Sequence, residues 1–437
     1  MLIPQSRRYV RLISLHGQRR ALFVLGGITV GAAAVGLALA ADQAQSAFDW
    51  LIRGHAWFAL AITPAGFAAS RWLTHRFFPA AGGSGIPQAI AARALEAPAA
   101  RARLVSLRLA AGKIVLTLLG LLCGASVGRE GPTVQVGASI LFAAGRLSPR
   151  RQPGLILAGA SAGVAAAFNT PLAGIVFGIE EMSRSFEART SGTIIAAVIA
   201  AGLTAIALVG DYTYFGTSNA GLHGLTGWLA VPALGVAGGL AGGLFSRLLI
   251  LFGHGLPGAV GRAIARHPIA FAAACGLGVA LCGLASGGTT FGTGYAEARN
   301  LVGGAPGASL WFGLAKFVAT VLSAISGIPG GIFAPSLAVG AGLGADASAL
   351  LPSTAAGPLI ILGMVAYFAG VVQAPITAFV IVTEMTADRA LLVPAMLIAL
   401  IATATSKLIC PEGVYHALSH NFLRPCGPDR AGAASRP

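Results

Sequence analysis

The sequence predicts an all-α membrane protein that crosses the bilayer many times and is built from two homologous halves. Its composition is 56% hydrophobic and only 10% charged, whereas soluble domains carry about a quarter charged residues. Apolar runs follow one another along the 437 residues, separated by short basic segments. A long stretch of the first half also matches a stretch of the second half without a gap. Because one crossing needs about 20 apolar residues, the chain has room for about ten.

The apolar runs mark the predicted membrane segments. They lie at 21–41, 55–70, 104–125, 133–145, 153–182, 191–210, 225–252, 268–286, 308–326, 336–350, 357–384 and 391–410. The first is too long for the core of a signal peptide, so we predict a retained membrane helix. Several runs are short or cut by some of the 61 Gly and 23 Pro residues. Such segments fit closely packed, broken helices whose ends meet inside the protein.

The net charge of +15 comes from Lys and Arg clusters between the apolar runs, among them 7–20, 93–108 and 146–152. This distribution is typical of cytoplasmic loops, so we interpret it as topology rather than as nucleic-acid binding. Both termini carry Arg, which predicts that both lie in the cytoplasm after an even number of crossings. The five Cys residues show no CxxC spacing. No metal site, disulfide framework or cofactor is therefore predicted.

The internal repeat is the strongest signal for the organisation of the chain. The segment "GKIVLTLLGLLCGASVGREGPTVQVG" (112–137) lies over "AKFVATVLSAISGIPGGIFAPSLAVG" (315–340) without a gap. After a slip of one residue, "FNTPLAGIVFGIEEM" (168–182) matches "VQAPITAFVIVTEM" (372–385). Repeats of this kind indicate duplicated structural units. Whether the two units run parallel or inverted depends on their numbers of crossings, which the sequence counts poorly.

Individual matches within the repeat identify paired positions. Lys113 lies over Lys316, Pro132 over Pro335 and Glu180 over Glu384, and a looser pair joins "GSGI" (83–86) to "GTGY" (292–295). The predicted division of the chain is an N-terminal segment, a first membrane repeat, a connector, a second membrane repeat and a short tail, at 1–20, 21–215, 216–224, 225–420 and 421–437.

Three segments share one design, in which small residues precede a proline and an apolar helical run. They are "GGSGIPQAIA" (82–91), "GREGPTVQVGASI" (128–140) and "GGIFAPSLAVGAGL" (330–343). Proline favours the first turn of a helix, and a helix N-terminus presents free N–H groups that suit an anion. The alternative is that these glycines only permit close helix crossing. Two such segments at matching positions of a repeat favour an anion site.

The motifs "GSGIP", "GREGP" and "GIFAP", followed by a late tyrosine in "GVYHAL" (413–418), resemble the CLC chloride channels and proton-coupled chloride exchangers. The resemblance extends over about 20–420. It implies two inverted-topology repeats whose broken and re-entrant helices meet at a midplane anion site. It also implies a homodimer in the lipid bilayer, here of the bacterial inner membrane. Few residues follow the tyrosine, so no cytoplasmic CBS domains are expected.

The resemblance also implies roles for single residues. Ser84 and Tyr415 would offer hydroxyls to chloride, and the N–H groups of Ile332 and Phe333 would complete that site. Glu130 would be the gate, and Glu181 would transfer protons. The surrounding loop residues would support this arrangement; they are Gly83, Gly85, Pro87, Gly128, Arg129, Gly131, Pro132, Gly331 and Pro335.

The chemistry of the acidic residues agrees with these roles. A carboxylate is itself an anion, so ionised Glu130 can occupy an anion position and block the path, and protonation releases it. Glu180 has Glu384 opposite it in the repeat, which favours an architectural role. Glu181 has Met385 opposite it, and a buried acid can carry protons near neutral pH. It is therefore the candidate for proton transfer.

The roles of three basic residues stay open. Arg129 either holds its loop or raises the local positive potential, and a structural pair with Glu130 is disfavoured because adjacent side chains rarely face one another. Lys113 and Lys316, paired by the repeat, are assigned to structure or to the local field.

Two alternatives to a chloride exchanger remain. The first is a passive chloride channel; exchange is favoured because Glu130 and Glu181 are both acids. The second, remote alternative is an intramembrane serine protease, since "GGSG" (82–85) and "GASAG" (159–163) resemble nucleophile motifs. A protease needs a partner histidine and leaves the repeat unexplained, so we expect no enzyme. Ser84 and Tyr415 together favour chloride over fluoride or nitrate.

Overall fold

The structure is a computed structural model, and it describes most of the chain. The described residues are 4–145, 151–183, 188–210, 213–216, 221–222, 224–304, 311–352 and 354–423, with side chains from Leu22 onward apart from a few positions near residue 190. Within these ranges the regular elements are helices. In addition, two isolated β-bridges pair residues of loops. The all-α prediction is confirmed for the described part of the chain.

The first half of the chain forms a series of helices of very different length. They are α1 (Pro4–Ile52), α2 (Ala59–Phe77), α3 (Ile86–Ala94), α4 (Pro98–Ala102), α5 (Leu107–Leu122), α6 (Glu130–Ala144), α7 (Gln152–Phe168), α8 (Pro171–Phe177), a π-helix (Gly178–Ser183) and α9 (Ala188–Val209). The helix α1 runs without a break from Pro4, in the predicted N-terminal segment, into the first apolar run.

The second half repeats much of this series. Its helices are α10 (Gly224–His254), α11 (Gly258–Arg266), α12 (Pro268–Ala285), α13 (Tyr295–Val302), α14 (Phe312–Ile325), α15 (Phe333–Leu350), α16 (Ala356–Val372), α17 (Pro375–Thr386), α18 (Leu392–Ile409) and α19 (Val414–Leu423). Most of the predicted connector 216–224, and the tail beyond Leu423, lie outside the described residues.

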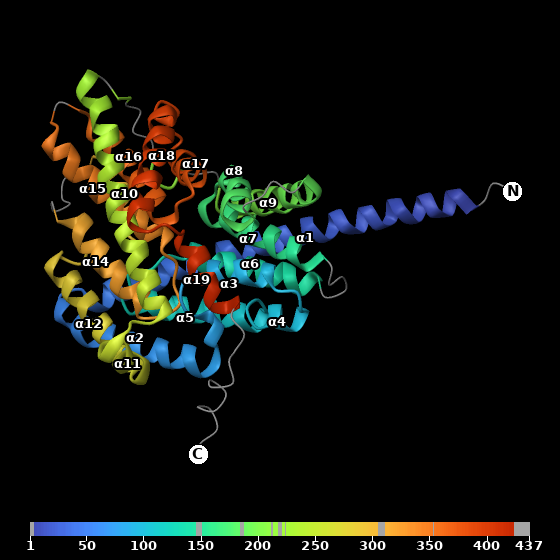
Figure 1. Cartoon of the computed structure of the whole chain (residues 1–437), viewed down its shortest axis with the longest axis horizontal. Helices are drawn as coiled ribbons and strands as arrows, with labels where there is room; N and C mark the ends of the chain where they lie inside the picture. Colours follow the sequence, from blue (N-terminus) through green and yellow to red (C-terminus); the bar gives the residue numbers. More distant parts are fainter. Residues whose placement is uncertain are drawn as a thin grey trace, which may run out of the picture.

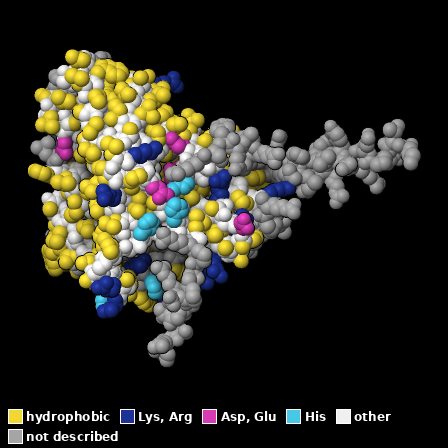
Figure 2. Space-filling view, in the orientation of Figure 1, with side chains coloured by type: hydrophobic (Ala, Val, Ile, Leu, Met, Phe, Trp, Pro, Cys, Tyr) yellow, Lys and Arg dark blue, Asp and Glu magenta, His cyan; other side chains and the backbone are white. Residues whose placement is uncertain are grey.

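Several helices are long and apolar enough to span a bilayer. Among the described residues these are Leu22–Ile52, Pro98–Leu122, Gly224–His254, Pro268–Ala285 and Leu392–Ile409. Shorter apolar helices lie between them, including α7, α14 and α16. Figure 2 shows hydrophobic side chains over most of the face formed by α10, α15 and α16, with few charges among them. The chain is an integral membrane protein with both spanning and partial helices.

Two of the predicted apolar runs are each divided into two helices. Within 153–182, α7 ends at Phe168 with Asn169 as its C-cap, and α8 begins at Pro171. Within 357–384, α16 ends at Val372 with Gln373 as its C-cap, and α17 begins at Pro375. Asn169 and Gln373 both have φ of 55°, a left-handed conformation that interrupts a right-handed helix. Proline then suits the first turn of the next helix. The prediction of broken helices is confirmed at both positions.

The halves also repeat their packing. The helix α6 packs against α7 as α15 packs against α16, and α1 packs against α9 as α10 packs against α18. Contacts between the halves join α2 to α12 and α8 to α17. In Figure 1, α6 to α9 gather around α1, and α15 to α18 gather around α10.

Glycines allow the closest helix crossings, at matching positions of the two halves. A Cβ atom on Gly137 of α6 would overlap the carbonyl oxygen of Gly159 in α7, and the converse also holds. A Cβ atom on Gly340 of α15 would lie 2.5 Å from the carbonyl oxygen of Gly363 in α16. Only glycine permits this approach of two backbones. The high glycine content therefore serves close packing as well as the loops.

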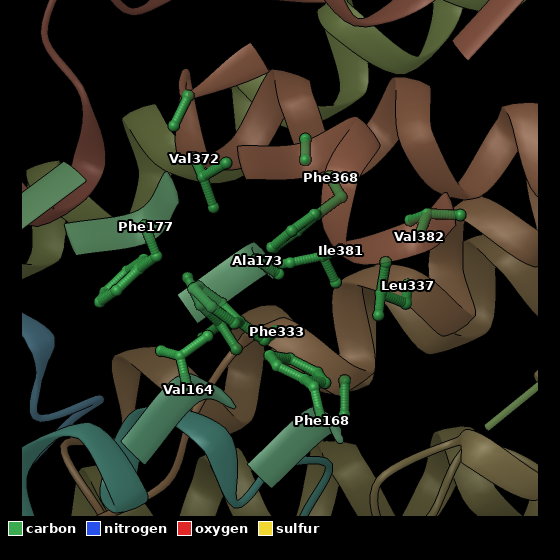
Figure 3. Close-up of a cluster of buried hydrophobic side chains, with 14 of the residues drawn as sticks. Val164, Phe168, Ala173, Phe177, Phe333, Leu337, Phe368, Val372, Ile381 and Val382 are labelled. Atoms are coloured by element: carbon green, nitrogen blue, oxygen red, sulfur yellow. The ribbon is translucent and has the colours of Figure 1, made fainter. Parts of the chain in front are cut away.

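The core between the halves is aromatic. The ring of Phe333 lies 5.8 Å from that of Phe168, 4.9 Å from that of Phe368 and 6.2 Å from that of Phe177. Figure 3 shows these rings converging from α7, α8, α15 and α16, with aliphatic side chains around them. Phe333 is the first residue of α15, so this cluster fixes the start of that helix.

Candidate functional site

The loops before α3, α6 and α15 are joined by backbone hydrogen bonds. The N–H of Gly83 donates to the carbonyl of Ile328 (3.1 Å), and the N–H of Gly330 donates to the carbonyl of Gly83 (3.1 Å). Gly128 and Gly331 exchange two such bonds of 2.7 Å each. The sequence motifs "GSGIP", "GREGP" and "GIFAP" therefore meet at one position in the structure.

The close contact of these loops depends on glycine. A Cβ atom on Gly131 would overlap the Ser84 Oγ, and one on Gly331 would lie 2.9 Å from the nitrogen of Gly131. Gly85 caps α3 with φ of 103°, which other residues rarely adopt. A proline stands in the first turns of all three helices, at Pro87, Pro132 and Pro335. The structure thus brings together the predicted supporting residues.

Two buried hydroxyls lie side by side next to these loops. Tyr415, in the first turn of α19, is 1% exposed, and its hydroxyl lies beside the Ser84 side chain. Apart from each other, the two oxygens have no hydrogen-bond partner among the described residues. A buried hydroxyl without a partner is unfavourable, and each of the two has one proton to donate. Both can donate to one shared anion.

The N-terminus of α15 faces the same region. Ile332 caps this helix and Phe333 begins it, so their N–H groups belong to the first turn, which has no intrahelical acceptors. The Phe333 ring lies 5.9 Å from the Tyr415 ring. The predicted chloride-binding residues Ser84, Ile332, Phe333 and Tyr415 are therefore brought together by α3, α15 and α19.

Glu130, the first residue of α6, is fully buried with its carboxylate against the second half of the chain. Its Oε2 accepts a hydrogen bond from the N–H of Ala334 (3.4 Å), in the first turn of α15. Its Oε1 accepts a bond from the hydroxyl of Tyr295 (2.7 Å). An acidic side chain thus lies at the same helix N-terminus that the motifs predict for an anion.

Tyr295 is a site residue that the sequence analysis did not identify. It appears there only as the last letter of "GTGY", which matches "GSGI". Its counterpart in the first half is Ile86, an apolar residue, so the repeat gave no sign of a polar role. The available signal was that mismatch: a hydroxyl stands in one copy where the other copy has none.

Arg129 holds its loop to α1. Its Nη1 donates to the carbonyl of Ala38 and to Oδ1 of Asp42, both at 2.6 Å, and its Nη2 donates to the hydroxyl of Tyr214 (2.9 Å). Its guanidinium also lies 5.6 Å from the centre of the Tyr295 ring. Of the interpretations left open by the sequence, the structure supports the anchoring of the loop.

The paired lysines hold equivalent loops in the two halves. Lys113 is fully buried and donates to the carbonyls of Ala81 (2.8 Å) and Gly83 (2.5 Å), directly before Ser84. Lys316 is also fully buried and donates to the carbonyls of Thr290 (2.9 Å) and Gly292 (2.8 Å), shortly before Tyr295. Both lysines have a structural role, since Lys113 holds the loop that carries Ser84 and Lys316 holds the loop before Tyr295.

Glu180 of the first half caps a helix of the second half, and Glu384 of the second half caps a helix of the first half. The Glu180 carboxylate accepts bonds from the N–H groups of Ile376 (3.1 Å) and Thr377 (2.6 Å) in the first turn of α17. The Glu384 carboxylate accepts bonds from the N–H groups of Leu172 (3.1 Å) and Ala173 (2.7 Å) in α8. The architectural role predicted for Glu180 is confirmed, and it is reciprocal.

Glu181 is 4% exposed and lies in the π-helix that follows α8. Its Oε1 is 3.9 Å from Nε2 of His416, and the same nitrogen donates to the carbonyl of Glu181 (2.8 Å). Arg93 of α3 donates to the next carbonyl, that of Met182 (3.1 Å). Because His416 directly follows Tyr415, the first turn of α19 contacts Glu181 and the paired hydroxyls alike.

Buried hydroxyls, helix N-termini and a buried carboxylate meet here within a bundle of broken membrane helices, an arrangement that defines an ion-transporting membrane protein. Within that class, the chain belongs to the CLC family, since the family model described as voltage gated chloride channel matches residues 65–407.

Similar proteins and a solved structure agree with this family. The chain is 33% identical over 427 residues to the H(+)/Cl(-) exchange transporter ClcA of Yersinia pestis bv. Antiqua (strain Angola), covering 90% of this chain and 85% of the relative. It is 35% identical over 371 residues to ClcA of Cronobacter sakazakii, covering 79% and 76%. A slow cyanobacterial Cl-/H+ antiporter has a TM-score of 0.77 at 26% identity, over 93% of this chain and 98% of that one.

Proposed function

We propose that the chain exchanges chloride for protons across the membrane, with Glu130 as the gate. The observation that carries this proposal is the placement of the Glu130 carboxylate. It lies at the N-terminus of α15, next to the paired hydroxyls of Ser84 and Tyr415. An ionised carboxylate in an anion position excludes chloride, and a protonated one does not compete for it. The relatives named exchange transporters support the same function.

Chloride binds, in this proposal, between the hydroxyls of Ser84 and Tyr415 and the N–H groups of Ile332 and Phe333. The two hydroxyls supply the donors, since neither has a hydrogen-bond partner among the described residues apart from the other. The N-terminus of α15 adds a partial positive charge without a full cationic side chain. This combination replaces the water shell of the ion with weak, distributed donors.

Glu181 is the proposed carrier of protons on the other side of the gate. It is buried, and His416 with its partly exposed ring lies 3.9 Å away. Protons pass between Glu181 and Glu130, so that each protonation of the gate admits chloride. The pair of acids couples the two flows.

The larger assembly is proposed by analogy with the family. We propose that the two repeats are inverted in the membrane and that two copies form a homodimer, each with its own ion path. The membrane is the bacterial inner membrane, and both termini lie in the cytoplasm. The repeated packing of the halves and the basic segments between apolar runs support this arrangement.

A passive chloride channel is the alternative within the family. It differs in that protons would not move with chloride, although Glu130 could still gate. The protease alternative is not favoured, because the chain belongs to a family of transporters and channels and its relatives are named exchange transporters.

The experiment that tests the proposal uses purified protein in liposomes. An outward chloride gradient is imposed, and the external chloride concentration and pH are recorded together. We expect chloride efflux to drive protons inward, which makes the weakly buffered outside solution more alkaline. Chloride efflux without proton uptake, in the presence of an ionophore that dissipates the voltage, would support the channel instead.

A further inference from the structure

We infer that Tyr295 is a positioning residue for the gate: its hydroxyl holds the ionised Glu130 carboxylate in the anion position and sets the pH at which chloride flux begins. This inference rests on the proposed function, because it assigns a role within the proposed gate. It concerns a residue of the second half acting on an acid of the first half.

The contact is short and shielded from water. The hydroxyl of Tyr295 donates to Oε1 of Glu130 at 2.7 Å, with Glu130 fully buried and Tyr295 9% exposed. The other oxygen is held by the N–H of Ala334. A hydrogen bond to an ionised acceptor is about twice as strong as a neutral one, and a water-poor environment strengthens it further. The Tyr295 hydroxyl therefore stabilises the charged gate more than the neutral one.

The hydroxyl is held in a fixed position by the structure around it. Gly294 caps α13 with φ of 82°, and Lys316 fixes the preceding loop through the carbonyls of Thr290 and Gly292. The Tyr295 ring packs 5.0 Å from the ring of Tyr214 and also contacts Phe215. Because the ring is already ordered, little conformational entropy is lost in making the bond to Glu130.

Other charged and titratable groups also lie around the Glu130 carboxylate. Those facing Glu130 or Tyr295 from the packed elements are Arg129, Tyr214, Tyr415 and, through Arg129, Asp42. Arg129 also favours the ionised gate, but its hydrogen bonds go to α1 and Tyr214. Removal of the Tyr295 hydroxyl leaves those bonds and the ring contacts in place, so its contribution can be measured by itself.

The repeat shows that this contact is an addition to a shared frame. The equivalent position in the first half is Ile86, whose helix start is held by Lys113 just as that of Tyr295 is held by Lys316. Both copies thus have the lysine-held loop and the helix. Only the second copy presents a hydroxyl at this position, and only the gate glutamate uses it.

The test is the Tyr295→Phe variant, which removes the hydroxyl and keeps the ring. Chloride and proton fluxes are measured together in liposomes over a range of pH. We expect the pH midpoint of chloride flux to move upward by about one pH unit, as the loss of one hydrogen bond to a charged group requires. Proton coupling is retained because Glu130 and Glu181 are unchanged.

Two further variants make the result specific. Tyr367→Phe removes another buried hydroxyl, from a ring that packs on Phe245 and Phe317, and it should leave the midpoint at the wild-type value. The single variant Glu130→Ala and the double variant Glu130→Ala with Tyr295→Phe should have the same chloride flux at every pH, because the partner of the hydroxyl is gone in both.

A wild-type midpoint in Tyr295→Phe, or an equal shift in Tyr367→Phe, would overturn the inference. Failure of the proposed exchange is seen separately, as an absence of proton movement in the wild-type protein. Even then, chloride flux that depends on pH would still report whether Tyr295 holds the gate.

Discussion

At the scale of single residues, the structure explains why a charged pair stands in the glycine-rich loop 128–131. Arg129 is anchored to Asp42 and Tyr214, and Glu130 has a hydrogen-bond donor for each carboxylate oxygen. A buried charge is tolerated only when it is paired or hydrogen-bonded. The two adjacent residues therefore have separate partners, and the Glu130 carboxylate is the one that lies at the N-terminus of α15.

Replacement of Glu130 by alanine tests the gate. The variant Glu130→Ala lacks both the carboxylate that blocks the anion position and the proton that it carries. We expect chloride flux to continue at every pH, without the pH dependence of the wild-type protein and without proton uptake. Flux assays in liposomes measure all three properties. Retained coupling of protons to chloride in this variant would exclude Glu130 as the gate.

Replacement of Glu181 by glutamine tests the proton path. Glutamine keeps the size and shape of the side chain but has no carboxyl group that can take up and release a proton. Glu181→Gln should therefore transport chloride at a rate near that of wild type, with proton movement reduced at least about tenfold, which corresponds to about 1.4 kcal/mol. The matched variant Glu180→Gln alters the neighbouring acid, which caps α17, and should keep proton movement.

Residues at this scale were only partly predictable. The motifs led to Ser84, Glu130 and Tyr415, because short sequence patterns specify helix starts and the groups beside them. Tyr295 and His416 could not be found in that way. Each acts through a partner distant in sequence, and their contacts exist only after α13 and α19 have packed.

At the scale of elements, the halves are held together by reciprocal helix caps. Glu180 of the first half accepts N–H groups of α17, and Glu384 of the second half accepts N–H groups of α8. A carboxylate at a helix N-terminus is favourable both as a hydrogen-bond acceptor and as a charge. The sequence repeat predicted that these two acids are equivalent, but it could not show that they cross between halves.

Loss of either cap should destabilise the protein by a similar amount. Glu180→Ala and Glu384→Ala each leave two N–H groups at a helix start without their carboxylate, at a cost of about 1–2 kcal/mol. Thermal unfolding in detergent should show a lowered midpoint for both variants. Glu412→Ala is the control, because its exposed side chain only approaches His420 at 3.7 Å. A stability loss confined to one of the two caps would contradict the reciprocal role.

The glycine crossings make a second prediction at this scale. In Gly340→Ala the added methyl group presses on the carbonyl of Gly363, so α15 and α16 must separate. We expect a loss of about 1–3 kcal/mol in stability, seen as a lowered thermal midpoint. Gly36→Ala is the matched control, because a Cβ atom at Gly36 in α1 meets no atom within 4 Å. Equal midpoints for the two variants would show that the crossing tolerates a side chain.

At the scale of the whole molecule, the composition and the repeat predicted the class of fold. The number of helices was harder to predict from the sequence. Hydropathy locates long spans such as α10 and α18, since they meet lipid along their length. It does not resolve α8 from α7 or α17 from α16, where one residue in a left-handed conformation interrupts an apolar run. Short helices such as α13, with polar residues among apolar ones, have no periodic signal of a membrane span.

The whole molecule also explains why the site is built from distant segments. The loops before α3, α6 and α15 come from both halves, and α19 belongs to the second half. The N-termini of α3, α6 and α15 meet in the protein interior, and they form a position that suits an anion and that neither half alone could provide. Glu130 lies at that position, and in the proposed function it links anion movement to protons together with Glu181.

The most direct test of this account is the reversal potential of the reconstituted protein under opposed chloride and proton gradients. With the chloride gradient held constant, a change in the proton gradient should shift the reversal potential, because the two ions move in a coupled exchange. A reversal potential that stays at the chloride equilibrium value at every proton gradient would contradict the account.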